Sequence, residues 1–260
     1  MPADASVTPT PTPRYPVAGT RIAAVTMASA LDLCLAAVAD GRRLNVHFCT
    51  THTLVEAADD PLLRARLERP DAVACPDGMP LVWVGRLAGV EVERVCGPDF
   101  MPALFDRGRE IGARHAVYGG APGVAEELAA RLVARYPGAE VVLTASPPFR
   151  PLTDEEDAAE VARLNAAAPD FVWVGLGSPK QDHWLATHRD RLDAAVLFAV
   201  GAAFDFHAGR LRRAPRWMQR TGTEWLFRLV SEPRRLLRRY SVTNTRFVLL
   251  LLRSRRLRAG

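Results

Sequence analysis

The 260-residue chain lacks several patterns that would define its chemistry at once. Its four cysteines form no C-x-x-C pair, which argues against a zinc knuckle and indicates reduced thiols in a cytosolic setting. There is no D-x-D pair, no Walker loop and no G-x-S-x-G elbow. No apolar run approaches the roughly 20 residues that a membrane-spanning helix needs. These absences exclude a membrane span and weaken the case for a bound metal or a serine nucleophile.

The composition is that of a soluble globular protein, with 48% hydrophobic and 24% charged residues. Residues 1–19 are rich in Pro, Thr and Ala, show no apolar core of a signal peptide, and are predicted to be disordered. Residues 20–206 are predicted to form one domain. Residues 207–260 are predicted to form a helical, basic appendage.

Charge is distributed unevenly along the chain. The net charge is +5, but residues 208–260 contain 15 Arg against Glu224 and Glu232, a net +13, which leaves −8 on the remainder. Arg mixed with Trp, Phe and Leu is typical of helices that lie in the interface of an anionic membrane. The alternative is a basic helix packed on the body with solvated arginines. Nucleic acid is not expected as a partner, because no known nucleic-acid-binding module is recognisable.

Strand and helix patterns alternate through the central part of the chain. Strands are expected at 21–26, 44–49, 72–74, 115–118, 141–144, 171–174 and 195–200. Helices are expected at 28–39, 53–67, 79–87, 98–113, 124–135 and 154–167, and beyond residue 207 at 215–220, 223–230, 233–240 and 242–257. This alternation predicts an α/β, Rossmann-like, largely parallel sheet with helices on both faces, followed by the helical appendage.

The stretch DFVWVGLGSPKQDHW, residues 170–184, combines a buried strand with a glycine turn and the start of a helix. Gly177 allows the turn, Ser178 is expected to cap the helix, and Lys180 and Gln181 lie in its first turn. A helix N-terminus with a lysine favours an anion, and Gln181 adds an amide that can orient a ligand. The alternative is an ordinary connection between a strand and a helix.

Two further glycine turns follow predicted strands, at 119–123 and 201–203. Ligands of open parallel sheets bind beyond the carboxyl ends of the strands. Gly119 and Gly120, together with Gly177, therefore predict a phosphorylated ligand such as a nucleotide.

Asp77 follows a short strand and precedes Gly78, so it is expected at the same edge of the sheet. A carboxylate there can act as a general base if burial raises its pKa toward neutrality. The alternative is a Pro-Asp-Gly turn in which Asp77 caps the following helix.

Taken together, these segments resemble the WecG/TagA/CpsF family of bacterial glycosyltransferases. The matching segments are CPDGMPLVW (75–83), RVCGPDFMPAL (94–104), YGGAPGVAEELAARL (118–132), VWVGLGSPKQDHW (172–184) and the long stretch 199–240. They occur in family order and cover most of the chain from about residue 44 to 240.

The resemblance implies roles for particular residues. Asp77 matches the aspartate proposed as catalytic base, and Gln181 matches the glutamine proposed to hold the nucleotide sugar. Arg213, Arg220 and Arg228 lie in the segment whose arginines are thought to close over the diphosphate. The family usually carries T-x-N at the second strand, where this chain has Phe48-Cys49-Thr50, with Thr50 in place of the asparagine. Threonine offers a bound sugar one hydroxyl in place of an amide, which changes the hydrogen bonds that the sugar can form at this position.

The resemblance also implies an activity: inverting transfer of a sugar from a UDP-sugar to a polyprenyl-diphosphate-linked saccharide, without a metal or other cofactor. The expected location is the cytoplasmic face of the membrane, and homo-oligomer formation is left open. The rival interpretation is a catalytically silent nucleotide-sugar or lipid-binding protein of the same fold, which would release no UDP.

Overall fold

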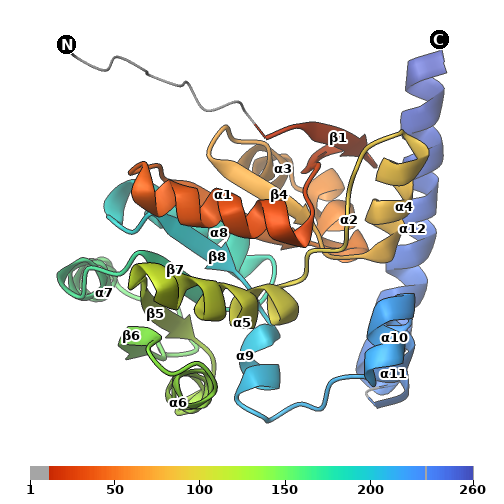
Figure 1. The fold of residues 1–260 in the computed structure, drawn as a ribbon. Helices are drawn as coiled ribbons and strands as arrows, with labels where there is room; N and C mark the ends of the chain where they lie inside the picture. The colour runs from red at the N-terminus through yellow and green to blue at the C-terminus, as the bar shows by residue number, and fades with distance from the viewer. Residues whose placement is uncertain (1–11, 232, 260) are drawn as a thin grey trace, which may run out of the picture.

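The computed structural model describes residues 12–231 and 233–259, without the side chains of residues 216, 220, 221, 228, 231–240 and 255–259. The strands are β1 (Arg14–Val17), β2 (Thr20–Ala23), β3 (Leu44–Cys49), β4 (Ala72–Pro76), β5 (Arg114–Gly119), β6 (Glu140–Ala145), β7 (Phe171–Gly175) and β8 (Val196–Ala199). The main sheet has the order β4-β3-β8-β7-β5-β6, and all its neighbouring strands are parallel (Figure 1). The strand β1 pairs with β2 in a separate antiparallel hairpin.

The helices alternate with these strands as the sequence predicts. They are α1 (Met27–Ala39), α2 (Thr51–Asp59), α3 (Pro61–Leu67), α4 (Met79–Leu87), α5 (Gly97–Gly108), α6 (Val124–Arg135), α7 (Asp154–Ala166), α8 (Lys180–His188), α9 (Ala203–His207), α10 (Arg216–Thr221), α11 (Glu224–Ser231) and α12 (Pro233–Ala259), with 3₁₀ turns at Arg109–Ile111 and Arg189–Arg191.

Both faces of the sheet are covered, which the unbroken apolar strands predict. In β7, Phe171 and Trp173 pack on one face with residues of α1, α5 and α6. Val172 and Val174 point to the other face, where α7 and α8 cover them. Near β3 and β4, α2, α3 and α4 close a third cluster with the β1–β2 hairpin. The predicted α/β Rossmann-like fold is confirmed.

The prediction that residues 1–19 are disordered is wrong for the part that the structure describes. Tyr15 and Val17 are buried, 2% and 0% exposed, and alternate with Pro16 along β1. This period-two pattern places both side chains on one face of a short strand. The composition of the whole segment concealed these few residues, and residues 1–11 lie outside the described part.

Two helices that precede the C-terminal segment differ from the prediction. The helix expected over 53–67 is divided, because Asp60 accepts hydrogen bonds from the backbone N–H groups of Leu62 and Leu63 and Pro61 starts α3. The short helix α9 was not predicted. Its Phe204 is 1% exposed and packs on the glycines that follow the central strands.

The C-terminal helix α12 is continuous over 27 residues, where the sequence predicted two pieces. It packs along α2, and its Phe247 is 4% exposed within the cluster of α2, α3 and α4. None of the helices in the described part of the chain is long and apolar enough to cross a membrane.

Candidate active site

The parallel sheet brings the predicted site residues to one edge, because each follows the carboxyl end of a strand. Asp77 follows β4 and Thr50 follows the neighbouring β3. The backbone N–H of Asp77 donates to the carbonyl of Cys49 at 2.9 Å, which fixes the two strand ends side by side. The turns after β5 and β7 lie at the same edge, since Gly119 pairs with Gly175 in register.

Asp77 does not cap the helix that follows it. The N-cap of α4 is Gly78, and no side chain bonds to that helix end. The Asp77 carboxylate instead faces Arg94, with Oδ1 3.4 Å from Nη2, while Arg94 Nε donates to the Asp77 carbonyl at 2.8 Å. The capping interpretation is therefore wrong, and the carboxylate is available at the sheet edge.

The environment of Asp77 makes it a stronger base than a surface carboxylate. Burial raises its pKa to about 6, with Arg94 opposing the rise and the nearby Glu224 and Asp99 adding to it. Its side chain remains 18% exposed. Such a carboxylate is largely ionised at neutral pH and can accept a proton from a neighbouring hydroxyl.

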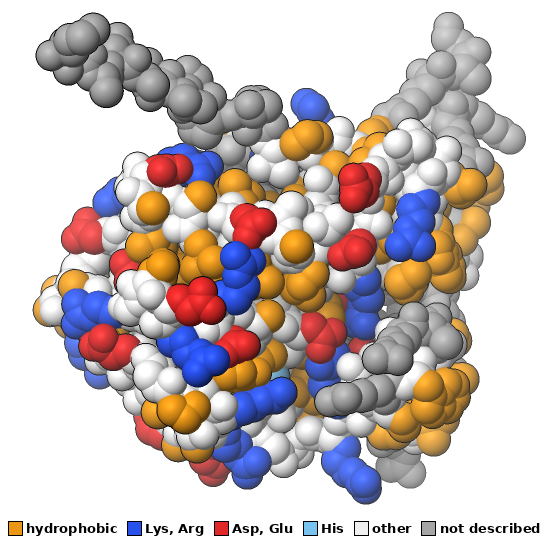
Figure 2. Space-filling view, in the orientation of Figure 1, with side chains coloured by type: hydrophobic (Ala, Val, Ile, Leu, Met, Phe, Trp, Pro, Cys, Tyr) orange, Lys and Arg blue, Asp and Glu red, His pale blue; other side chains and the backbone are white. Residues whose placement is uncertain are grey.

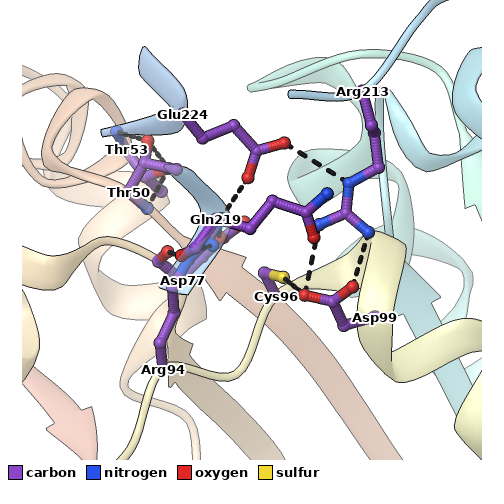
Figure 3. Close-up of polar contacts among 9 residues, drawn as sticks. All are labelled: Thr50, Thr53, Asp77, Arg94, Cys96, Asp99, Arg213, Gln219 and Glu224. Carbon is purple, nitrogen blue, oxygen red and sulfur yellow. Dashed lines mark hydrogen bonds and ion pairs between the residues drawn. The ribbon is translucent and has the colours of Figure 1, made fainter. Parts of the chain in front are cut away.

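A chain of ion pairs joins Asp77 to the C-terminal segment (Figure 3). Arg94 Nη2 donates to Glu224 Oε2 at 3.1 Å, so one guanidinium links the candidate base to α11. Glu224 also accepts from Arg213 Nε at 3.3 Å, and Arg213 Nη2 donates to Asp99 Oδ2 at 3.1 Å. Asp99 additionally accepts from the Cys96 thiol at 2.9 Å. These contacts dock α11 over the end of β4.

Arg213 is thus engaged in ion pairs within the protein, whereas the resemblance implied that it closes over a diphosphate. Its side chain is 19% exposed and pairs with two carboxylates. Its part in binding a diphosphate stays a prediction. Arg220 lies in α10 and Arg228 in α11, and the side chains of both are outside the described residues.

Thr50 is the N-cap of α2. Its Oγ1 accepts from the backbone N–H of Thr53, and the Thr53 hydroxyl accepts from the N–H of Thr50, so the two form a capping box. The Thr50 side chain is half-buried. The hydroxyl lies at the end of β3, beside the candidate base, and it also stabilises the helix end.

Close packing accounts for Gly119 and Gly120. A Cβ on Gly119 would lie 2.6 Å from the carbonyl oxygen of Gly175, and one on Gly120 would lie 2.9 Å from Val124. Phe204 covers Gly120 and Gly175 from α9. Gly177 differs, because it is exposed and nothing lies within 4 Å of the position of its Cβ. Of the three, only Gly177 leaves open space for a ligand.

The turn before α8 is built around buried polar contacts. Gln181 is 5% exposed, and its Oε1 accepts from the backbone N–H of Gly177 at 3.1 Å. Lys180 is exposed at the first position of the helix. Ser178 is not the N-cap, since Pro179 takes that place, and the Ser178 hydroxyl donates to Asp182 at 3.1 Å. The structure therefore presents Gly177, Ser178 and Lys180 to solvent and places Gln181 beneath them.

Comparison with known proteins decides the family. The model of the "Glycosyl transferase WecG/TagA/CpsF family" matches residues 15–260. The chain belongs to this family. A curated relative from Bacillus spizizenii (strain ATCC 23059 / NRRL B-14472 / W23) is 31% identical over 188 residues, which cover 72% of this chain and 71% of the relative. That relative is an N-acetylglucosaminyldiphosphoundecaprenol N-acetyl-beta-D-mannosaminyltransferase.

In this WecG/TagA/CpsF chain, three charged residues surround Asp77 that were not predicted from the sequence. Arg94 and Asp99 lie in the segment RVCGPDF, and Glu224 lies in GTEW. Each segment entered the resemblance as a whole, without roles for its charged members. The available signal for these residues was that an arginine and two carboxylates lie inside segments that match one family.

Proposed function

We propose that this WecG/TagA/CpsF glycosyltransferase is an inverting, metal-independent enzyme. It would move N-acetylmannosamine or a related hexose from a UDP-sugar to a polyprenyl-diphosphate-linked saccharide during synthesis of a cell-surface polysaccharide. The proposal is supported mainly by the position and pKa of Asp77. Its half-buried carboxylate has a pKa of about 6 and lies at the edge of the sheet where ligands of such folds bind.

In the proposed reaction, Asp77 accepts the proton of the acceptor hydroxyl while its oxygen attacks the anomeric carbon. The bond between that carbon and the UDP oxygen breaks, and UDP leaves with the electron pair. A single displacement of this kind inverts the anomeric centre. Negative charge grows on the leaving diphosphate, which preorganised donors and positive charge stabilise.

The donor is proposed to bind at the turn before α8. Gly177 leaves space there, Lys180 supplies positive charge, and the nine-residue helix that begins at Lys180 adds the positive end of its dipole. Gln181 would act through this turn, since its amide oxygen already holds the N–H of Gly177. Thr50 lies across the sheet edge and is the residue proposed to meet the sugar.

The acceptor is proposed to be anchored in the membrane by its polyprenyl chain, as the substrate name of the relative suggests. The enzyme would then work peripherally on the cytoplasmic face, attracted by the +13 charge of residues 208–260 to anionic lipid. Such binding would weaken in high salt, because exposed charges are screened within about 8 Å at physiological ionic strength.

The test is UDP release by the full chain over a panel of UDP-sugars, with a lipid-linked N-acetylglucosamine acceptor analogue. We expect acceptor-dependent release with one donor, unchanged by a metal chelator, and a product with inverted configuration. Binding of a UDP-sugar without release would favour the silent binding protein. Loss of activity with chelator and its return with a divalent cation would contradict metal independence.

A further inference from the structure

The helix α4 starts at Met79, two residues after the candidate base, and has an apolar outer face. Trp83 is 54% exposed and Leu87 is 77% exposed. Residues four apart on a helix lie on the same side, one turn above the other. A large aromatic and a leucine therefore stand together in solvent close to Asp77.

The opposite side of α4 is well packed, so the helix itself is held firmly. Leu81 and Val82 are fully buried, and a Cβ on Gly85 would lie 2.7 Å from a side-chain carbon of Val92. When one side of a surface helix is packed on the core in this way, the side that faces solvent is normally polar. The exposure of Trp83 and Leu87 thus calls for a partner with an apolar surface.

Contacts place α4 next to the C-terminal helices. Met79 packs against Gly222 in the turn between α10 and α11, where a Cβ would lie 2.3 Å from Met79 Cγ. Phe247 of α12 belongs to the same cluster as Leu81 and Val82. The start of α4 consequently lies against the turn between α10 and α11, and its buried side shares a hydrophobic cluster with α12.

The C-terminal helices also expose large apolar side chains. They include Trp217, Trp225, Leu226, Val230, Val248 and Leu252. Figure 2 shows hydrophobic side chains gathered along the right-hand edge of the molecule, over α4 and α12 and over α10–α11 below them. The apolar surface of the C-terminal helices and that of α4 therefore lie along one edge.

We propose that Trp83 and Leu87 of α4 insert into the interface of an anionic bilayer together with the C-terminal helices. This rests on the proposed function, which requires the enzyme to reach a membrane-anchored acceptor. The charge argues for lipid, because residues 208–260 carry +13 and Arg86 is exposed on α4 between the two apolar residues. Tryptophan suits this environment, since its ring is apolar and its N–H can stay hydrated.

The placement has a consequence for the reaction. A helix of nine residues is about 13 Å long at 1.5 Å per residue. With its outer face in the bilayer interface, α4 would hold Asp77 within about that distance of the lipid surface. An acceptor could then present its sugar hydroxyl to Asp77 while its lipid chain remains in the membrane.

The test measures binding of the full chain to phosphatidylcholine vesicles with and without phosphatidylglycerol. The variant is Trp83→Ser/Leu87→Ser, and the matched control is Ile111→Ser/Phe149→Ser, whose wild-type side chains are 53% and 92% exposed on other parts of the surface. We expect the first pair to weaken binding to anionic vesicles about tenfold or more. The control should bind like wild type, and both variants should keep the wild-type unfolding midpoint.

Neither pair changes the charge, so the salt dependence of binding should keep its slope while the α4 variant loses affinity. Brominated lipids should quench wild-type fluorescence more than that of Trp83→Phe. Equal vesicle binding by wild type and the α4 variant would overturn the proposal. So would concentration-dependent self-association that the α4 variant abolishes, since the face would then bind a second copy. Vesicle binding requires no donor, so these outcomes are independent of UDP release.

Discussion

Arg94 and burial together set the pKa of the Asp77 carboxyl, on which the proposed chemistry depends. Burial raises the pKa of the carboxyl to about 6 and Arg94 holds it below what burial alone would give. A base must be deprotonated to act, so with Asp77 as the proposed base we expect activity to fall as the pH drops through about 6. The effect of pH on stability has the opposite sign. The folded state favours the protonated carboxyl of Asp77, so this contribution to the free energy of unfolding is lost as pH rises through about 6.

Arg94→Gln should raise the pKa of Asp77 further, because it removes the cation that opposes burial. We expect the acidic limb of the kcat/KM profile to move to higher pH, with activity falling about tenfold per unit below the new pKa. Arg94→Lys keeps the charge and should return the limb toward its wild-type position. An unmoved limb in Arg94→Gln, with activity simply lowered, would mean that Arg94 does not tune the base.

Thr50→Asn tests whether this position meets the sugar. Asparagine is as good an N-cap as threonine, so the stability of α2 should be preserved, whereas Thr50→Ala should cost about 1 kcal/mol. The new amide should change the relative kcat/KM values across the donor panel. Unchanged donor preferences in Thr50→Asn would make Thr50 a capping residue alone.

Asp77 could be identified from the sequence alone, because the end of a strand, a proline and a glycine adjoin it in the chain. The partners of Asp77 could not be identified in this way, because Arg94 lies 17 residues from Asp77 and Glu224 lies 130 residues from Arg94, and the three meet only through the fold. The same limit applies to Gly119 and Gly120. Their turn was recognisable, but the packing of Phe204 from a distant helix was not.

At the scale of elements, the strong local patterns gave reliable predictions. The helix over 124–135 and the strand over 44–49 have the predicted bounds, since each combines a clear apolar period with flanking turn residues. The elements that the sequence did not predict were β1 and α9, which have four and five residues. Elements of this length are stabilised by packing on the rest of the fold, and they contain too few residues to show a hydrophobic period.

Gly222→Ala tests the docking of α10–α11 on α4. Its φ of +73° costs an L-residue about 1–2 kcal/mol, and the Cβ would also collide with Met79. Gly138→Ala is the matched control, because Gly138 has a φ of +93° and open space around its Cβ position. We expect Gly222→Ala to be the more destabilised variant and to show faster proteolysis after residue 207. Equal effects of the two substitutions would mean that the contact with Met79 contributes nothing.

At the scale of the whole molecule, the C-terminal segment is part of the core as well as an appendage. The change of pattern past residue 207 predicted a helical appendage. The contacts of α12 with α2 could not be predicted from the charge and hydrophobicity of that segment. Deleting the last helix would uncover the cluster around Phe247. Single substitutions therefore separate membrane binding from stability better than truncation does.

Phe247→Ala should lower the free energy of unfolding by about 3–5 kcal/mol, as expected for a buried phenylalanine. Val248→Ala, the neighbouring residue that is 53% exposed, should change it little. Chemical denaturation followed by circular dichroism measures both. A loss below about 1 kcal/mol for Phe247→Ala would show that α12 is not integral to the fold.

Turnover of Asp77→Asn at saturating donor measures whether Asp77 is the general base. The amide keeps the size of the side chain but cannot accept the proton, so turnover should fall about 10²–10⁴-fold while affinity for the UDP-sugar is retained. Asp32→Asn, an exposed carboxylate that pairs with Arg107, is the control and should behave like wild type. Near wild-type turnover of Asp77→Asn would contradict the assignment of Asp77 as the base.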